Sequence, residues 1–415
     1  MAEYREIAAC RLCGATTLDA IVDFGAVALG NNLLESAAEA KQATAYPLVL
    51  MRCEGCGHFQ LGHAVDPKIL YATNYTYLTG IGASFIRHLE DYAAWANAKG
   101  LLPKDALVVD IGSNDGTCLK MFKAKGARVC GVDPAQMPAR IANENGIDTF
   151  NMFFGAKAVE KIKAKHGAAD YVTSHNVLAH VDDLAGTFAN IYALLKDGGV
   201  FCFEIGYFRD VLRLGYFDTI YHEHLDYHHA EPLARHLAEL GFDIEEFTVN
   251  QSQGGSLRTL CRKTGQGRIL PAAQIFLDAE RGSEVNDMAF LKGWRGSIER
   301  KMGAFADMLR ERAAKGLAIA GYGAPTKATL LMKMSGLGAD DVAYVVEDNK
   351  LKTGRYLPVS GVPIKPTAEL MSVTPDVVVL FAWNFADDIV GRLRGKLGKP
   401  VEAIVPLPEP RTVSL

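Results

Sequence analysis

The sequence lacks any apolar run that approaches the roughly 20 residues of a membrane-spanning helix. Its first residues, Met-Ala-Glu-Tyr-Arg-Glu, contain no apolar segment of the kind found in signal peptides. We therefore expect a cytoplasmic protein without a membrane partner. Basic residues are not in excess, since 44 Lys and Arg stand against 48 Asp and Glu, so we expect no nucleic acid partner. Eight cysteines in 415 residues argue against a disulfide scaffold.

The remaining composition is that of an ordinary globular protein, with 49% hydrophobic and 22% charged residues. A chain of this length is sufficient for two or three domains with buried cores. We expect it to be a monomer or a weak homo-oligomer.

Four of the cysteines form two Cys-x-x-Cys-Gly motifs, which contain Cys10, Cys13, Cys53 and Cys56. Two such turns supply the four thiolates that a tetrahedral structural Zn²⁺ ion requires. The 39 residues between the motifs exceed the loop of a compact zinc ribbon, so we expect short strands near the second motif. A redox-active dithiol pair and a chance pattern are the alternatives.

A short β-branched strand that ends in Asp110 leads into the glycine-containing turn Gly112-Ser-Asn114-Asp-Gly116. Such a turn presents backbone N–H groups to a ligand. A glycine also permits close approach, because it has no Cβ atom. A second strand ends at Asp133, 21 residues after Gly112, where a nucleotide-binding fold places a carboxylate against ribose hydroxyls.

Two cofactor classes fit this turn, dinucleotides and S-adenosylmethionine. A dinucleotide turn normally contains three glycines, whereas this turn has two and carries Asp115, which would repel a pyrophosphate. The same carboxylates suit a cationic ligand that carries an amine. Together with the later Leu194-Leu-Lys-Asp-Gly-Gly199 turn, they are similar to those of class I S-adenosylmethionine-dependent methyltransferases, so we favour S-adenosylmethionine as the cofactor.

Strands and helices alternate from about residue 107 to about residue 204, which predicts a doubly wound parallel sheet. We expect strands at residues 128–133, 147–150, 170–176 and 200–204. Ligands of such sheets bind beyond the carboxyl ends of the strands. Asn176 and His180 fall on that side.

Histidine is concentrated in one region, with five of the eleven histidines between residues 222 and 236. The sequence Tyr221-His222-Glu223-His224 offers a general base with a carboxylate that could orient it or stabilise its charge. In an extended chain Tyr221 and Glu223 would share one face, and His222 and His224 the other. A polar surface loop and a second metal site are the alternatives.

Tyr75 and Tyr77 alternate in a tyrosine-rich segment, so an extended chain would point both to one face. Such tyrosines either pack between two domains or line a ligand cleft with a hydroxyl group.

The second half of the chain repeats the pattern of strand, glycine turn and helix start at residues 317–327, which predicts a second α/β unit. Its turn, Gly321-Tyr-Gly323-Ala, is followed by Lys327 at the predicted helix N-terminus, a position that suits an anion. The turn either holds the phosphates of a ligand or is a scaffold turn without a ligand. The preceding tract 294–309 predicts a core helix.

Five motifs occur in order along nearly the whole chain: the two cysteine motifs, Asp110–Thr117, Tyr221–His224 and Gly254–Arg258. Through these motifs the chain resembles the three-domain sugar C-methyltransferases. Those enzymes act on nucleotide-linked keto-sugars and typically methylate C3 of a dTDP-linked 4-keto sugar.

The resemblance implies a set of active-site residues, with His224 as the general base, Tyr221 and Glu223 beside it, and Tyr77 and His180 in the same pocket. It also implies contacts of the nucleotide sugar with Tyr75, Gly323, Lys327, Asn349 and Lys352. The family often has a histidine where this chain has Gln253, which puts an acid/base role at that position in doubt. A base next to the ketone would form an enolate, to whose oxygen Tyr221 or Tyr77 could donate.

We therefore predict an α/β protein in three parts. Residues 1–80 form a zinc-knuckle domain, residues 81–265 a class I methyltransferase Rossmann-like parallel sheet, and residues 266–415 a second Rossmann-like domain. The predicted function is methyl transfer from S-adenosylmethionine to a carbon, expected to be C3, of a nucleotide-diphosphate 4-keto-deoxysugar, most simply dTDP-linked. The alternatives are a methyltransferase with an oxygen or nitrogen acceptor, and a non-catalytic zinc protein that recognises a nucleic acid or a partner.

Overall fold

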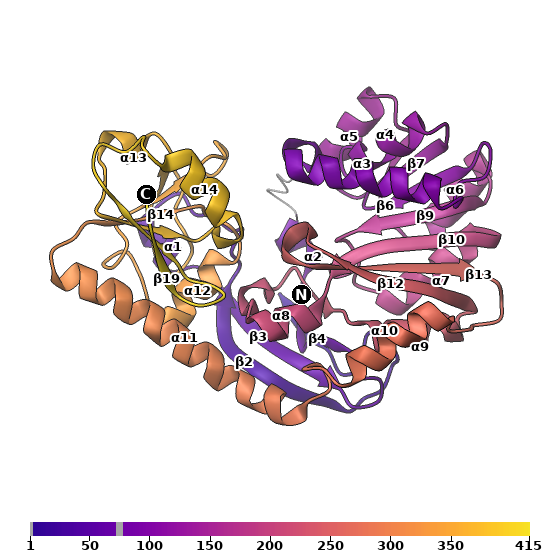
Figure 1. Cartoon of the computed structure of the whole chain (residues 1–415), viewed down its shortest axis with the longest axis horizontal. Helices are drawn as coiled ribbons and strands as arrows, with labels where there is room; N and C mark the ends of the chain where they lie inside the picture. Colours follow the sequence, from indigo (N-terminus) through magenta and orange to yellow (C-terminus); the bar gives the residue numbers. More distant parts are fainter. Residues whose placement is uncertain (1–2, 72–77) are drawn as a thin grey trace.

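The computed structural model describes residues 3–71 and 78–415 of the chain. Figure 1 shows the larger α/β sheet at one end of the molecule and a smaller one at the other, with long strands and the long helix α11 between and beneath them. Tyr75 and Tyr77 lie outside the described residues.

The N-terminal sheet is antiparallel and has the strand order β11-β4-β3-β2. Its strands are β2 (Leu18–Ala28), β3 (Ala45–Cys53), β4 (Phe59–Leu61) and β11 (Asp226–Tyr227). The region also contains the strand pair β1 (Tyr4–Glu6) and β5 (His63–Val65), with α1 (Ala37–Lys41), α2 (Pro67–Tyr71) and η1 (Thr79–Ile81). β3 and β4 confirm the strands predicted around the second cysteine motif.

The larger α/β sheet has the order β12-β13-β10-β9-β6-β7-β8. Its strands are β6 (Leu107–Ile111), β7 (Arg128–Asp133), β8 (Thr149–Asn151), β9 (Ala169–His175), β10 (Leu195–Gly206), β12 (Phe242–Asn250) and β13 (Ser256–Lys263). β6 to β10 run parallel and β13 is antiparallel to both its neighbours, which confirms the predicted class I sheet. β10 begins earlier than predicted, because Leu195 pairs with β9 before a register shift that ends at Val200.

Helices pack on both faces of this sheet, because successive side chains of its buried strands point to opposite faces. Val108 packs with the helices α3 and α4, and Val109 with α6 and α7. The helices of this part are α3 (Ala83–Ala98), α4 (Thr117–Ala124), α5 (Gln136–Glu144), α6 (Ala156–His166), α7 (Leu184–Leu194), α8 (Phe208–Leu214), η2 (Phe217–Thr219), α9 (Ala230–Glu239) and η3 (Ser252–Gly254).

The C-terminal sheet has the order β16-β15-β14-β17-β18-β19. Its strands are β14 (Ile319–Tyr322), β15 (Val345–Glu347), β16 (Ile364–Pro366), β17 (Val377–Leu380), β18 (Glu402–Val405) and β19 (Arg411–Ser414). The helices of this half of the chain are α10 (Pro271–Arg281), α11 (Met288–Ala314), α12 (Ala328–Ser335), α13 (Glu369–Ser372), η4 (Trp383–Phe385) and α14 (Ala386–Leu393). Of these, α10 packs on β12 and belongs to the core of the larger sheet. β14 to β18 run parallel, so a second Rossmann-like unit is present, as predicted.

Helix α11 joins the second half of the chain to the N-terminal strands. Asp287 caps its N-terminus by accepting hydrogen bonds from two backbone N–H groups, and Trp294, Ile298 and Met302 lie on its buried face. These side chains share one hydrophobic core with β2 and with the C-terminal sheet. The cysteine motifs instead pack into the core of the larger sheet. The N-terminal region therefore bridges the two α/β units.

Among the residues that the structure describes, every helix is too short or too polar to cross a lipid bilayer.

Candidate active site

The four cysteines of the two motifs form a cluster at the N-terminal end of the chain. Their Sγ atoms all lie within 4.8 Å of one another, and the pairs Cys10–Cys56 and Cys13–Cys53 are 3.7 Å apart. A tetrahedral zinc ion with Zn–S distances of about 2.3 Å separates its sulfur ligands by about 3.8 Å. The four thiols therefore fit a closed structural zinc site.

The glycine turn after β6 has the predicted place, but Gly112 is required for a different reason. A Cβ atom there would lie 2.3 Å from Cγ2 of Val177, and the residue has φ +69°. The space that we expected a ligand to use is thus filled by the segment that follows β9. Gly112 lets the ends of β6 and β9 approach each other beside the predicted cofactor site.

The carboxylate of Asp115 accepts hydrogen bonds at the N-terminus of α4. One oxygen accepts hydrogen bonds from the backbone N–H and the hydroxyl of Thr117, at 3.1 and 2.6 Å, and the other accepts from the backbone N–H of Gly80 at 2.8 Å. A pyrophosphate bound at this helix N-terminus would need the same hydrogen-bond donors and the same positive end of the helix dipole. The carboxylate of Asp115 already occupies both. The geometry thus disfavours a dinucleotide, as Asp115 predicts.

Two further carboxylates lie at the carboxyl ends of neighbouring strands. Asp133 accepts hydrogen bonds from the backbone N–H groups of Asn114 and Ala135, both at 2.8 Å. Asp110 is buried, and burial, followed by the charge of Asp133, raises its pKa well above the ordinary value. Its Oδ1 atom has no hydrogen-bond partner among the described residues. An orphaned buried carboxylate fits a ligand that brings an amine, as S-adenosylmethionine does.

The segment after β9 joins the cofactor turn to the histidine-rich region. Asn176 has φ +56° at the end of β9, and His180 follows it. The carbonyl oxygen of Ala179 accepts hydrogen bonds from the backbone N–H groups of Leu225 and Asp226, at 2.6 and 3.3 Å. Through Val177 and Ala179 this segment connects the glycine turn after β6 with residues 225–226, more than 100 positions further along the chain, at one edge of the sheet.

Residues 217–224 form the loop that carries the predicted base, and we name this segment the catalytic loop after that prediction. Nδ1 of His224 donates to the carbonyl oxygen of Thr219 at 3.0 Å, and Nε2 accepts from the hydroxyl of Tyr221 at 2.8 Å. The ring centroids of His180 and His224 are 4.7 Å apart. Burial, followed by the charge of His180, holds the pKa of His224 well below its ordinary value. The neutral imidazole is therefore the stable form.

The catalytic loop is a turn and not an extended chain, which corrects the predicted faces. His222 points away from His224, and its Nε2 donates to the carbonyl oxygen of Tyr46 at 3.2 Å. Burial lowers the pKa of His222 to about 4, so this histidine is a neutral part of the core. Because a turn brings residues three apart together, Tyr221 pairs with His224 instead of sharing a face with Glu223.

Glu223 lies beside this pair but points to the N-terminal region. Its Oε1 atom accepts a hydrogen bond from Nδ2 of Asn31 at 3.1 Å, and the described residues offer no partner to its buried Oε2 atom. Burial raises the pKa of Glu223 above the ordinary value. The carbonyl oxygen of Glu223 accepts from Nδ1 of His180 at 2.7 Å, which leaves Nε2 of His180 as an acceptor.

The lysines predicted to hold phosphates both have partners within the protein. Nζ of Lys327 lies 3.7 Å from a carboxylate oxygen of Asp218, and Nζ of Lys352 donates to the carbonyl oxygen of Ala324 at 2.8 Å. Burial lowers the pKa of both lysines. The structure thus shows no free lysine cation at these two positions, and a phosphate contact of either remains a prediction.

The glycine turn between β14 and α12 reproduces the arrangement of the glycine turn between β6 and α4. The carboxylate of Glu347, at the end of β15, accepts from the backbone N–H groups of Ala324 and Asn349, at 2.8 and 3.0 Å. Asp133 accepts from the equivalent groups in the first α/β unit. At Gly323 a Cβ atom would lie 2.6 Å from that of Ala382, so glycine is again needed for packing. Glu347 could have been predicted from the sequence, because it is the last residue of the second strand of the C-terminal α/β unit.

Asn31 and Asp218 were not predicted as part of the site, although both contact its residues. Asp218 lies in the catalytic loop and accepts from Nε1 of Trp383 at 2.6 Å. Their partners are between 109 and 295 positions away in the sequence, so no local pattern indicates them.

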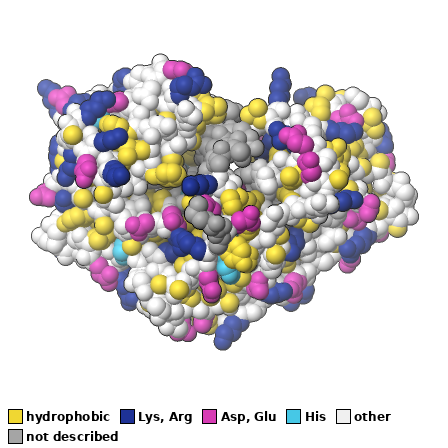
Figure 2. All heavy atoms as spheres, turned by 180° about the vertical axis from the view of Figure 1, so that it is seen from behind, with side chains coloured by type: hydrophobic (Ala, Val, Ile, Leu, Met, Phe, Trp, Pro, Cys, Tyr) yellow, Lys and Arg dark blue, Asp and Glu magenta, His cyan; other side chains and the backbone are white. Residues whose placement is uncertain are grey.

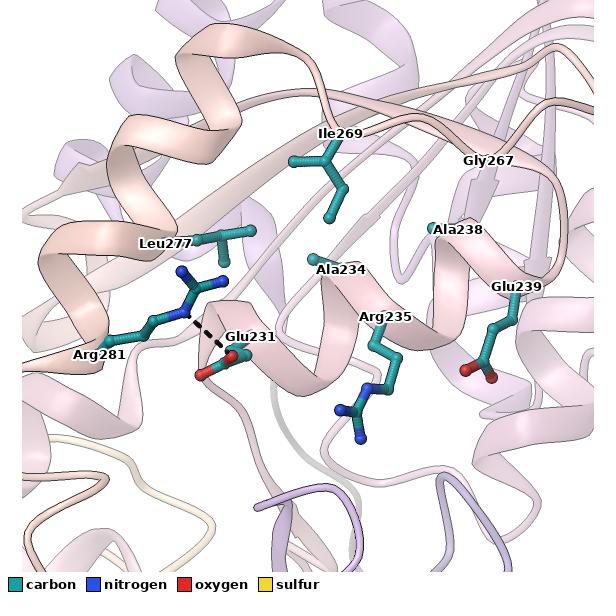
Figure 3. A pocket seen from close by; sticks show the side chains of 9 residues that line it. All are labelled: Glu231, Ala234, Arg235, Ala238, Glu239, Gly267, Ile269, Leu277 and Arg281. Carbon is teal, nitrogen blue, oxygen red and sulfur yellow. Dashed lines mark hydrogen bonds and ion pairs between the residues drawn. The ribbon is translucent and has the colours of Figure 1, made fainter.

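A surface cavity of about 430 Å³ lies elsewhere, between α9, α10 and the loop that connects β13 to α10. Figure 3 shows its apolar floor, which includes Ala234, Ile269 and Leu277, and the ion pair of Arg281 with Glu231 at its rim. None of the predicted site residues lines this cavity. On the face shown in Figure 2, acidic and basic side chains are interspersed, which agrees with the absence of excess basic charge in the sequence.

Family models match three successive parts of the chain. A "Putative zinc binding domain" matches residues 10–71, a "Methyltransferase domain" residues 85–246, and a "C-methyltransferase C-terminal domain" residues 251–408. The C-methyltransferase NovU of Streptomyces niveus is 32% identical over 411 residues, which cover 99% of this chain and 98% of NovU. The chain belongs to the C-methyltransferase family. It is an S-adenosylmethionine-dependent C-methyltransferase with a zinc-binding region, as the sequence resemblance predicted.

More distant relatives match only part of this C-methyltransferase. The ubiquinone biosynthesis O-methyltransferase of Bordetella pertussis is 33% identical over 94 residues, 22% of the chain and 39% of that enzyme. Among solved structures, magnesium protoporphyrin IX methyltransferase of Synechocystis with bound SAM matches 43% of the chain and 79% of its own, at 17% identity and a TM-score of 0.33.

Proposed function

We propose that this C-methyltransferase acts on a nucleotide-diphosphate 4-keto-deoxysugar and methylates the carbon next to the ketone, expected to be C3, with His224 as the general base. The observation that carries the proposal is the hydrogen-bonded pair of Tyr221 and His224 at the carboxyl edge of the sheet, 2.8 Å apart. A methyl acceptor that is a carbon must first lose a proton, and a neutral imidazole is suited to remove it.

The residues of the first turn would hold the cofactor. Asp110 offers an unpartnered oxygen to an amine, and Asn114, Gly116, Asp133 and Asn176 lie in the same turn or at the neighbouring strand ends. Gly112 contributes by permitting the close packing of the turn against Val177. S-adenosylmethionine supplies a methyl group that a carbon nucleophile can attack. The protein's own task is therefore to generate that nucleophile and to align it.

Proton removal places a charge on the ketone oxygen. As Nε2 of His224 takes the proton from the carbon, the C–H electron pair forms the enolate, and its oxygen needs a hydrogen-bond donor. Tyr221 can turn its hydroxyl from His224 to that oxygen, and Tyr77 remains a second candidate. The enolate carbon then bonds to the methyl group while the sulfur of the donor keeps the electron pair of the broken bond.

The test is to incubate the enzyme with S-adenosylmethionine and a panel of dTDP-, UDP- and GDP-linked 4-keto-6-deoxysugars. We expect one product 14 mass units heavier, with NMR signals of a methyl group on carbon. A methyl group on oxygen or nitrogen would overturn the proposal. His224→Ala should lower turnover at least about a hundredfold and leave binding of S-adenosylhomocysteine unchanged. His166→Ala is the matched control, because His166 lies on α6 and pairs with Asp148.

A partial reaction separates proton removal from methyl transfer. In D₂O with S-adenosylhomocysteine in place of the donor, the wild-type enzyme should exchange the proton next to the ketone of its substrate, detected by mass. His224→Ala should lose this exchange. Normal exchange in that variant would assign the base to another residue.

A further inference from the structure

The turn between β14 and α12, residues 323–327, contacts the catalytic loop through Asn31. We call this segment the C-terminal turn. The hydroxyl of Thr326 donates to Oδ1 of Asn31 at 2.7 Å, and Nδ2 of Asn31 donates to Oε1 of Glu223 at 3.1 Å. An amide oxygen only accepts, and an amide nitrogen only donates. In this arrangement Nδ2 of Asn31 faces Glu223, and the hydroxyl of Thr326 donates to the oxygen at the other end of the same amide.

The next residue of the C-terminal turn reaches the other end of the catalytic loop. Nζ of Lys327 lies 3.7 Å from Asp218 and 4.1 Å from the centroid of the Trp383 ring. Nε1 of Trp383 donates to the same oxygen of Asp218 at 2.6 Å. Asp218 directly precedes Thr219, whose carbonyl oxygen accepts from Nδ1 of His224. One turn thus supports both Glu223 and His224.

Asn31 is held in place by contacts of its own segment with the C-terminal unit. A Cβ atom at Gly30 would lie 2.0 Å from the carbonyl oxygen of Thr326, so the two backbones touch. Leu34 and Tyr356 exchange two backbone hydrogen bonds, at 3.1 and 2.9 Å. The position of Asn31 is therefore set by packing on both sides, although its side chain is exposed.

We propose that Asn31 is a positioning residue for Glu223, and that Thr326 and Lys327 orient the two catalytic side chains from the C-terminal turn. Glu223 needs such support because it is buried and only one of its oxygens has a partner in the described part of the chain. The inference rests on the proposed function, in which Glu223 and His224 act on the substrate. It gives the glycine turn of the second Rossmann-like unit a role in aligning the active site.

The test compares Asn31→Ala, Thr326→Val and Thr326→Ser, with Asn32→Ala as the matched control. Asn32 is the neighbouring exposed amide, and its side chain makes no hydrogen bond with a described residue. Loss of a hydrogen bond to a charged group corresponds to a decrease of about tenfold or more, so we expect kcat to fall about tenfold in the Ala and Val variants. KM and binding of S-adenosylhomocysteine should not change, and Thr326→Ser should behave as the wild type.

A double-mutant cycle distinguishes positioning from a general loss of structure. Asn31→Ala with Thr326→Val should be no slower than either single variant, because both break the same connection. In a Glu223→Gln background, Asn31→Ala should have little further effect. Additive losses, or an equal loss in Asn32→Ala, would overturn the proposal.

Lys327→Met tests the second contact through the separate values of kcat and KM. We expect kcat to fall about tenfold with KM for the nucleotide sugar unchanged. A higher KM with an unchanged kcat would assign Lys327 to the phosphates and overturn its positioning role.

A crystal structure of Asn31→Ala gives a measurement that does not depend on the substrate. We expect the Glu223 carboxylate to leave its position while the backbone of the catalytic loop stays in place. Glu223 in its original position would overturn the inference. If instead the carboxylate moves but the wild-type enzyme methylates none of the keto-sugars, the proposed function fails and the positioning role of Asn31 stands.

Discussion

Nδ1 of His224 donates a hydrogen bond to the backbone carbonyl oxygen of Thr219, at a distance of 3.0 Å. Because a carbonyl oxygen only accepts, Nδ1 carries the ring proton and Nε2 carries the lone pair. The backbone therefore selects the tautomer in which Nε2, next to Tyr221, is the basic atom.

The pH dependence of the reaction follows from the surroundings of His224. Burial and the neighbouring His180 hold its pKa well below the ordinary histidine value of about 6.5. The base is thus already neutral at pH 7, and kcat/KM should decrease only as the pH falls well below 6.5. In His180→Gln one cause of the lowered pKa is absent, so the acid limb should move to higher pH. A wild-type profile that declines from pH 7.5 to 6.5 would contradict this assignment.

The close approach at Gly112 predicts a loss of stability on substitution. In Gly112→Ala the new Cβ atom would lie 2.3 Å from Val177, at a φ of +69°. The left-handed backbone and the overlap together should cost about 2–4 kcal/mol of unfolding free energy, measured by urea denaturation. Gly126→Ala is the control, because Gly126 has φ +88° and no atom within 4 Å of its Cβ position, so only the backbone cost of about 1 kcal/mol applies.

The overlap can be relieved on the other side. Gly112→Ala combined with Val177→Ala should recover the part of the loss that comes from the contact, and retain the part that comes from φ. If the double variant is less stable than the sum of the two single-variant losses in unfolding free energy predicts, the side chain of Val177 is not the group that the new Cβ atom overlaps.

The four-cysteine cluster predicts one bound zinc per chain with a structural role. Cys53→Ser removes a ligand that lies 3.7 Å from Cys13 and within the core of the larger sheet, so zinc content and folded yield should both fall. Zinc is measured by elemental analysis. Cys130→Ala, a buried cysteine outside the cluster, should retain the zinc. Soluble and fully active Cys53→Ser protein without zinc would refute the structural role.

Local patterns predicted the parts of this molecule in which neighbouring residues decide the conformation. The strand and turn from Asp110 to Gly116 and the two cysteine motifs are of this kind, because hydrophobic runs, glycines and ligand spacing are local signals. The faces expected of Tyr221–His224 in an extended chain do not apply, because this segment is a turn. His224 points to the carbonyl oxygen of Thr219 within the same loop, whereas the contact of His222 with Tyr46, 176 positions away, depends on tertiary packing.

The contacts between distant segments had no sequence signal. Asn31 meets Glu223 across 192 positions and Thr326 across 295, and each residue alone is an ordinary polar side chain in a loop. The predicted phosphate role of Lys327 rested on its place after a glycine turn. Lys327 does lie at the N-terminus of a helix, as predicted, but its partner Asp218 comes from another part of the chain.

The contacts of Glu204, near the end of β10, lead to a prediction about stability: its contribution to the free energy of unfolding should depend on pH. One carboxylate oxygen accepts from Nε of Arg258 at 2.6 Å and the other pairs with Nε2 of His88 at 2.5 Å. Burial alone would raise the pKa of Glu204, but His88, His175 and Arg258 outweigh it and lower the pKa from 4.5 to about 2. The folded state therefore gains stability from the ionised form.

The sign follows from the lowered pKa. Above the unfolded value of 4.5 the stabilisation is complete, and it is lost as the pH falls toward about 2. The shift sets an upper bound of roughly 3 kcal/mol, because His175, with a pKa of about 4, is neutral at pH 7. Glu204→Gln should therefore be less stable than the wild type at pH 7 by up to that amount, and the difference should shrink below pH 4.5. Glu299→Gln, which removes an exposed pair with Arg295, should change the unfolding free energy by less than about 1 kcal/mol. A Glu204→Gln difference that stays constant from pH 7 to pH 3 would mean that packing, and not the charge, is what Glu204 contributes.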